Sequence, residues 1–320
     1  MDLVYMDQEY KDQGIIQNCT LDYEASTNPN DCTFQIKTTI AGNPLLKGDY
    51  IHVEGEEYGG RIDSIQVDTA KKIIIAEGRS WRGILASKIL IPPAGSAYKI
   101  VSGNVGKIIQ DLIDEAGIGD IFEAVPTKIT INKYQFYRYI DLYSGLIKMC
   151  GSKGLKLKIY WDHTKIKVEA IERTEYTKKN SITSDLFDFK IKTATSINHM
   201  IGLGSGELED RQVVHKYLDA DGNVSDEQVF TGISEYTQVY ENSGVESIED
   251  LAEQTEDALK KNKQSDQLEI TSYDLNCDIG DKIEASDAIT GISILRYVTD
   301  KILTIEDHIT KIQYKVGASI

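Results

Sequence analysis

The sequence has little proline, cysteine and tryptophan, and it has no long apolar run. Of its 320 residues, five are proline, four are cysteine and two are tryptophan, and every proline lies before residue 127. So few cysteines exclude a disulfide-dense miniprotein. The longest aliphatic stretches, such as residues 73–76, fall far below the roughly 20 apolar residues of a membrane-spanning helix. No membrane insertion is therefore expected.

Positive charge is also scarce. Lys and Arg total 35 against 51 Asp and Glu, which gives a formal net charge of −16. A negative field repels phosphate, so specific or non-specific nucleic-acid binding and docking on anionic lipid are not expected. The first residues are acidic, unlike the basic and then apolar start of a secretion signal. We therefore expect a soluble protein made in the cytoplasm.

The four cysteines are too scattered to form a metal-binding C-x-x-C motif. They are Cys19, Cys32, Cys150 and Cys277. Free, buried thiols in a reducing compartment are the expected state. Whether Cys19 and Cys32 ever pair stays open.

Residues 1–95 are predicted to form a first barrel-like β unit. Polar and apolar residues alternate over residues 33–36, 50–53 and 61–65, and glycines mark turns between these runs. Pro92 and Pro93 end this pattern, because their rings fix φ and remove two hydrogen-bond donors.

Residues 96–180 are predicted to form a small α+β domain with two helices and a hairpin. The first helix has helical spacing of apolar residues from Val105 to Ala116, with Asn104 as N-cap and Gly117 as stop. The second begins after Asp141. Alternation over residues 155–161 and 166–170 then predicts the hairpin.

The remainder returns to strands. Residues 181–245 are expected to complete the first half, with a hairpin whose arms are residues 212–218 and 227–231. Residues 246–264 are predicted to be a connecting helix that starts with a capping box at Ser247. Residues 265–320 are predicted to be a second barrel-like β unit, and Gly48-Asp49 and Gly280-Asp281 recur as similar turns. The predicted fold class is mostly β with an α+β insertion.

No constellation of residues predicts catalysis. A calcium loop starting at Asp219 lacks its Gly and its Glu, because Val224 and Phe230 hold those places; a hairpin turn is favoured instead. The glycine-rich stretch Gly202–Glu207 has no phosphate-binding Lys after it. The histidines show no metal-ligand spacing. We expect no catalytic, cofactor-binding or metal-binding residues, no cofactor and no enzyme activity.

Four stretches together resemble the central hub proteins of phage tails and contractile injection machines, a family that includes late-control D proteins and prophage hubs. They are Gly78–Leu85 followed by Lys88–Pro93, Gly202–Glu207 with Arg211, Asn276–Ile283, and Thr304–Gly317. Glu207 is interpreted as a structural partner of Arg211. Trp81 lies between two glycines in the first stretch, so we expect its ring to be packed at the end of a barrel and not to bind a ligand.

The resemblance implies a homotrimeric baseplate hub that joins the tail tube to the central spike or tail tip and forms part of the central channel. Implied partners are other copies of the chain, tail tube or tube-initiator proteins, the spike or tail-tip protein, and other baseplate proteins, including one with a LysM domain. The implied location is a virion or phage-tail-like particle, assembled in the host bacterial cytoplasm.

Two other hypotheses remain. One is a tail-tip peptidoglycan-degrading enzyme or cell-wall binding protein, and the other is a carbohydrate-binding β module unrelated to tails. The tail type, the host and the interface residues stay open.

Overall fold

The computed structural model describes residues 1–42, 44–176, 187–192, 196–219, 223–245, 247–262, 267–272, 277–286, 293–306 and 309–317. The chain forms two compact units. One comprises Met1–Lys190 and Leu268–Ile320, and the other comprises Ile191–Gln267. Within the described residues, no helix is long and apolar enough to cross a membrane.

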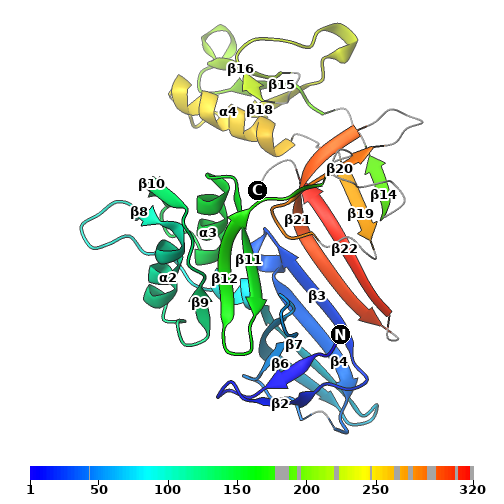
Figure 1. Ribbon diagram of the computed structural model, residues 1–320. Coiled ribbons are helices and arrows are strands. Elements are labelled where there is room, and N and C mark those ends of the chain that lie inside the picture. The colour runs from blue at the N-terminus through cyan, green and yellow to red at the C-terminus, as the bar shows by residue number, and fades with distance from the viewer. Residues whose placement is uncertain are drawn as a thin grey trace. The chain divides into compact units, whose positions relative to one another are not determined.

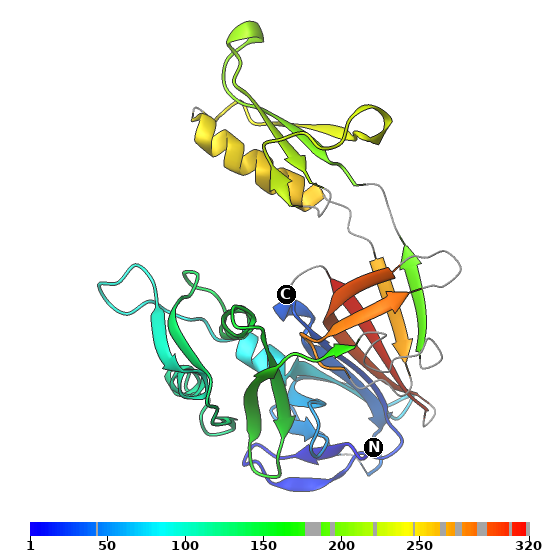
Figure 2. The ribbon, with the colours of Figure 1, turned by 45° about the horizontal axis from the view of Figure 1, so that its top comes forward.

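The larger unit is built on one curled sheet to which both ends of the chain contribute (Figures 1 and 2). Its N-terminal strands are β1 (Val4–Met6), β2 (Asp12–Ile15), β3 (Thr20–Ser26), β4 (Thr33–Thr39), β5 (Tyr50–His52), β6 (Gly59–Asp68) and β7 (Ile73–Ser80). Its later strands are β13 (Glu175–Tyr176), β14 (Phe187–Lys192), β19 (Gln267–Ser272), β20 (Lys282–Ser286), β21 (Ser293–Glu306) and β22 (Ile309–Gly317). Antiparallel pairing of β3 with β21 joins the two sets.

The sheet consists of two repeats with the same strand order. The order β3-β4-β7-β6-β5 in the first repeat corresponds to β14-β19-β22-β21-β20 in the second. The register agrees as well, because a bulge lies between Ile62 and Ser64 in β6 and between Val298 and Asp300 in β21. The two predicted β units are therefore confirmed, although they share one sheet.

The recurring Gly-Asp turns make the same hydrogen bonds in the two repeats. Gly48 N–H donates to the carbonyl of Ile62 at 2.8 Å, and Ile62 N–H donates back to the carbonyl of Asp49. In the second repeat, Gly280 N–H donates to Val298 at 2.9 Å, and Val298 N–H donates back to Asp281. Both glycines have positive φ, +100° and +102°, which favours glycine at these positions. The short sequence echo thus marks a structural equivalence.

The α+β part of the larger unit follows the predicted local signals. Its elements are α1 (Trp81–Ala86), β8 (Ile100–Asn104), α2 (Val105–Glu115), β9 (Phe122–Ala124), β10 (Thr130–Gln135), α3 (Leu142–Gly151), β11 (Leu155–Trp161) and β12 (Ile166–Glu172). The side chain of Asn104 caps α2 by accepting the Lys107 N–H, and Asp141 caps α3 by accepting the Ser144 N–H. Gly117, with φ +69°, follows α2 where a stop was predicted. The apolar faces of α2 and α3 share one core with the β11–β12 hairpin.

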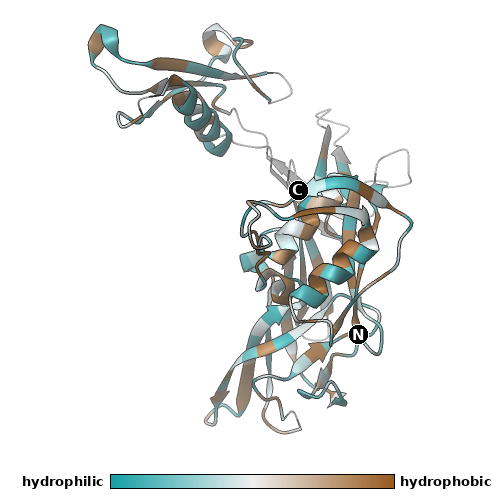
Figure 3. Ribbon diagram, turned by 90° about the vertical axis from the view of Figure 1, so that its left-hand side faces the viewer, coloured by the Kyte–Doolittle hydropathy of each residue, from teal (hydrophilic) through white to brown (hydrophobic). Residues whose placement is uncertain are grey.

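The smaller unit is a four-stranded sheet with one helix. Its elements are β15 (His199–Leu203), β16 (Val213–Leu218), β17 (Val224–Ser225), β18 (Thr237–Glu241) and α4 (Ile248–Asn262). Hydrophilic and apolar bands alternate along its helix and strands (Figure 3). Helix α4 packs on β15 and β16 and buries Leu251, Thr255 and Leu259.

This arrangement differs from the expected grouping of residues 181–245 with the first half and from a purely connecting helix. Strands β15 to β18 pair only with one another among the described residues, and α4 covers them. The predicted second hairpin arm, residues 227–231, is not a strand, because the chain bends where the Ser225 hydroxyl accepts the Glu227 N–H. The tip at residues 220–222 lies outside the described residues. The exact bounds of the five predicted segments stay predictions.

The glycine-rich stretch 202–207 lies under helix α4. A Cβ atom at Gly202 would lie 1.9 Å from Oγ1 of Thr255, and one at Gly204 would lie 2.9 Å from Cδ2 of Leu251. Glycine therefore allows the helix to approach the sheet closely.

Replacing Gly202 by Ala should destabilise the smaller unit by about 1–3 kcal/mol, because the added methyl group overpacks the contact with Thr255. Gly244→Ala is the control, since a Cβ there would make only an ordinary contact of 3.5 Å with Asn242. Thermal unfolding of both variants measures the effect. Equal stability of the two variants would contradict this interpretation.

Trp81 is fully buried, which confirms that it packs in the core. Its ring stacks between Tyr50 and Trp161, with centroid distances of 6.3 and 6.4 Å. Gly59 makes room for it, because a Cβ there would lie 2.5 Å from the indole nitrogen. The flanking Gly83 also permits a close approach, to the carbonyl of Cys32.

Trp81→Ala should lower the free energy of unfolding by about 3–5 kcal/mol, since it leaves a large cavity between two packed rings. Tyr137→Ala, at a side chain that is 67% exposed, should change it by less than about 0.5 kcal/mol. Denaturant titration of both variants tests this, and a Trp81→Ala protein as stable as the control would refute it.

Candidate functional site

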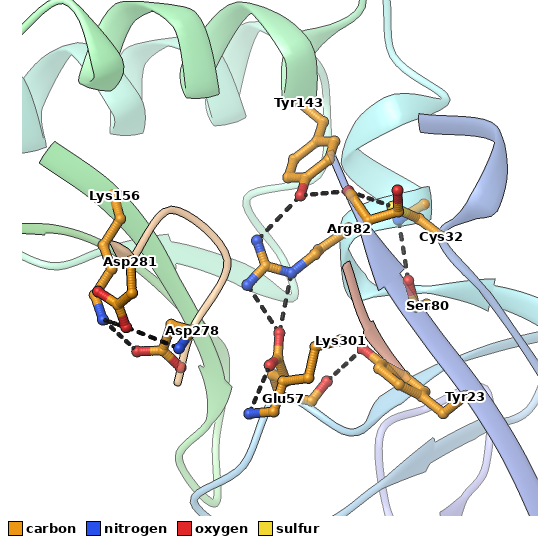
Figure 4. Close-up of polar contacts among 12 residues, drawn as sticks. Tyr23, Cys32, Glu57, Ser80, Arg82, Tyr143, Lys156, Asp278, Asp281 and Lys301 are labelled. Atoms are coloured by element: carbon orange, nitrogen blue, oxygen red, sulfur yellow. Dashed lines mark hydrogen bonds and ion pairs between the residues drawn. The ribbon is translucent and has the colours of Figure 1, made fainter. Parts of the chain in front are cut away.

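A network of buried ions lies where the two repeats and the α+β part meet (Figure 4). Arg82 in α1 donates through Nε and Nη2 to Oε2 of Glu57, at 3.0 and 2.8 Å. Lys301 in β21 places Nζ 3.2 Å from the other oxygen, Oε1. All three side chains are at most 6% exposed. The Glu57 carboxylate therefore pairs with two cations, Arg82 and Lys301, which are far apart in the sequence.

Two tyrosines extend this network to other elements. Arg82 Nη1 donates to the hydroxyl of Tyr143 in α3 at 3.1 Å, and that hydroxyl donates to the carbonyl of Ser26 at 2.8 Å. The Tyr23 hydroxyl donates to the carbonyl of Glu57 at 2.8 Å. Helix α3 is thus bonded to Arg82, and strand β3 is bonded to Tyr143 and to the backbone of Glu57.

The charges in this network are mutually stabilised. Burial alone would raise the pKa of Glu57, but Arg82 and Lys301 lower it to about 2. Burial opposes the charge on Lys301, yet Glu57 raises its pKa well above the usual range. The carboxylate and the ammonium group are both ionised at neutral pH.

A second buried cluster contains the Gly280-Asp281 turn. Lys156 in β11 donates to Asp278 at 2.7 Å and to Asp281 at 2.8 Å. Asp281 is fully buried and also accepts the Thr174 N–H at 2.8 Å. The described part of the family-like stretch 276–283 therefore fastens the second repeat to the β11–β12 hairpin.

Together the two clusters hold three cations and three carboxylates, so their formal charges cancel. The cations are Arg82, Lys156 and Lys301, and the carboxylates are Glu57, Asp278 and Asp281. A general acid or base needs a pKa near the working pH and access to a substrate. Glu57 has neither, because it is buried and its pKa is low. This geometry suits a structural role, in which the buried ions hold neighbouring strands and helices together.

The structure brings together two histidines whose spacing in the sequence showed no metal-ligand pattern. His199 Nε2 lies 2.8 Å from His215 Nδ1, and His199 Nδ1 lies 2.6 Å from Oε1 of Glu235. The pairing of β15 with β16 produces this contact. Ile201 lies opposite His215, and His199, two residues before Ile201, is therefore the diagonal neighbour of His215 on the same face of the sheet. A predicted register for this hairpin was the one signal that would have found it. Among the described residues, no group of three or more His, Cys, Asp or Glu is arranged to hold a metal ion.

The four cysteines are free thiols. Burial raises the pKa of Cys32 to about 11 and that of Cys150 to about 12. A thiol with so high a pKa carries little thiolate at neutral pH and is a poor nucleophile.

Arg211, the expected partner of Glu207, pairs differently. Its guanidinium forms an ion pair with Glu241 at the end of β18 and donates to the carbonyl of Gly204. Arg211 therefore pairs with Glu241 and not with the expected Glu207.

Two surface grooves of the larger unit have opposite character. A groove of about 490 Å³ over β3, β4, β6 and β7 is mainly acidic; its charged lining residues are Asp22, Glu24, Asp63, Glu77 and Arg79. Another of about 470 Å³ combines aromatic rings with cations; its side chains include Tyr134, Tyr137, Lys148, Arg173 and Tyr297. Both are open surface grooves and not enclosed ligand pockets. The aromatic rings and the arginine of the second are typical of protein contact areas.

The chain matches no protein-family model and no curated protein sequence. It does match solved structures over nearly its whole length. A tail protein from Neisseria meningitidis MC58 matches with a TM-score of 0.53 at 14% identity, covering 98% of this chain and 95% of that one. The 43 kDa tail protein of prophage MuSo2 from Shewanella oneidensis matches with a TM-score of 0.55 at 13% identity, covering 99% and 98%.

A third match is prophage tail protein gp18 from Listeria monocytogenes EGD-e, with a TM-score of 0.50 at 11% identity and coverage of 99% and 95%. The fold of this chain is therefore that of phage tail proteins. The resemblance expected from its sequence is confirmed at the level of the fold.

Acidification should remove the stabilisation that comes from Glu57. A pKa of 4.5 in the unfolded chain and about 2 in the folded protein corresponds to about 3 kcal/mol, present above pH 4.5. This stability should be lost as the pH falls from about 4.5 toward 2, because the unfolded chain takes up the proton first.

Urea titrations at several pH values test this, with Glu57→Gln as the comparison. That variant should be less stable by about 3–5 kcal/mol at neutral pH, since it leaves Arg82 and Lys301 without a counter-charge. Its stability should also fall less between pH 4.5 and 3. Identical pH profiles for the two proteins would refute the assignment.

Proposed function

We propose that this chain is the structural hub of a phage baseplate or a phage-tail-like particle. In this role it joins the tail tube to the central spike or tail tip and lines part of the central channel. The observation that carries the proposal is the match to tail proteins over almost the full length of both chains. Such a match concerns the whole architecture and not one common module.

The internal repeat of the sheet supports this role. With two equivalent β units per chain, a ring of three chains presents six similar units, which suits a junction between a six-fold tube and a three-fold spike. The buried ion network links the two repeats, because Glu57 lies in the first and Lys301 in the second. Such a link suits a ring that must keep its units in register.

The proposed partners are further copies of this chain in a homotrimer, tail tube or tube-initiator proteins, the spike or tail-tip protein, and other baseplate proteins. The proposed location is the tail tip of the particle, after assembly in the cytoplasm of the host. The net charge of −16 suits a channel wall that does not retain passing DNA.

The test is cryo-electron microscopy of the parent particle, together with native mass measurement of the purified chain. We expect three copies in one closed ring at the tail tip. A dimer, an open helical arrangement or a place outside the tail would contradict the proposal. A peptidoglycan zymogram serves as the second arm, and cleavage by the purified chain would favour the tail-tip enzyme instead.

A further inference from the structure

The two repeats differ in how one strand edge is used. In the second repeat, β21 pairs along one edge with β20 up to Tyr297 and then with β3 from Asp300 to Ile305. In the first repeat, the corresponding strand β6 pairs with β5 up to Arg61. Beyond that point, none of the described strands pairs with this edge of residues 64–68.

The shared bulge fixes the correspondence residue by residue. Ser64 follows the bulge in β6 as Asp300 does in β21, so Val67 corresponds to Leu303. The partners agree, because Val67 lies opposite Ile74 and Leu303 lies opposite Ile312. Leu303 is fully buried, whereas Val67 is 52% exposed. An apolar side chain that is covered in one repeat is thus uncovered in the other.

The strand that covers the β21 edge also has a counterpart. Strand β3 is the outer strand of the first repeat in the order given above, and β14 is that of the second; among the described strands, β14 is the last of the sheet and pairs with β19 alone. Residues 21–25 read Leu-Asp-Tyr-Glu-Ala and residues 187–191 read Phe-Asp-Phe-Lys-Ile, with the same apolar alternation. Within the part of the chain that the structure describes, β6 therefore has an edge without a partner strand, and the β3-like strand β14 has one too.

We propose that β14 of one copy pairs antiparallel with residues 64–68 of β6 in a neighbouring copy and so repeats the β21–β3 junction between chains. This pairing rests on the proposed hub function. Within one chain, β14 and β6 are separated by six intervening strands in the sheet order, so the occupant is a second copy. Free edges of this kind are satisfied in nature by strand addition.

Such a contact is head-to-tail, because each copy offers a different edge to each of its two neighbours. Contacts of this type close into rings when the rotation between copies permits. Junctions within chains and between chains would then alternate around the ring with the same geometry. The pairing also covers Val67 and the edge amides of β6.

A disulfide across the junction tests the register. Thr27 N–H donates to the carbonyl of Thr299, so antiparallel alternation makes Ile302 and Glu24 a non-hydrogen-bonded pair, whose side chains lie close together. The corresponding pair between copies is Gln66 and Lys190. The experiment oxidises the purified Gln66→Cys/Lys190→Cys protein and compares it with each single variant by denaturing gel, without and with a reductant.

The double variant should cross-link into one discrete multi-chain species that the reductant abolishes, while each single variant stays largely single-chain. Absence of cross-linking in the double variant overturns the pairing, whatever the native mass. A native trimer that does not cross-link refutes the strand pairing and leaves the hub proposal standing. Cross-linked rings with no copy in the tail particle refute the hub proposal and leave the pairing standing.

Val67→Lys provides a second test that needs no oxidation. A charge at this position should lower the assembled fraction about tenfold or more if the edge is covered by another strand. The control is Val239→Lys, at an equally exposed valine (54%) on the edge strand β18 of the smaller unit. Equal assembly of two folded variants would contradict the proposal.

Discussion

The pairing of the Glu57 carboxylate with Arg82 and Lys301 is the interaction on which the larger unit depends. These side chains come from the first repeat, from helix α1 and from the second repeat, and each is nearly inaccessible to solvent. Loss of the carboxylate would leave two buried cations without a counter-charge. The β21–β3 junction and the position of α3 are therefore coupled to one acid.

Local signals made much of this fold predictable. The caps at Asn104 and Asp141, the stop at Gly117 and the β11–β12 hairpin each depend on residues close together in sequence, and each is present as expected. The Gly-Asp turns were also predictable from the sequence, because a position that needs positive φ is usually occupied by glycine. Trp81 was predictable for a related reason, since glycines flank a ring that needs space.

Contacts that depend on strand register were not predictable. The ion pair between Glu57 and Lys301 joins residues that are far apart in sequence, and nothing near either residue indicates the other. His199 and His215 meet only because β15 and β16 align as they do. The expected connecting helix was identified as a helix, but its place on β15 and β16 depends on a sheet that sequence spacing does not define.

The residues that carried the family resemblance serve packing in this structure. A Cβ at Gly78 would lie 1.8 Å from the carbonyl of Arg61, Gly202 admits helix α4, and Asp281 satisfies a buried lysine and a backbone amide. Few other residues meet such constraints, whereas most strand positions require only an apolar or a polar side chain. This contrast explains how a fold can be shared at 11–14% identity, because most positions can change their residue without loss of packing. The strictest requirements of this fold are therefore steric and electrostatic, and they fall at close-packed glycines and at buried ions.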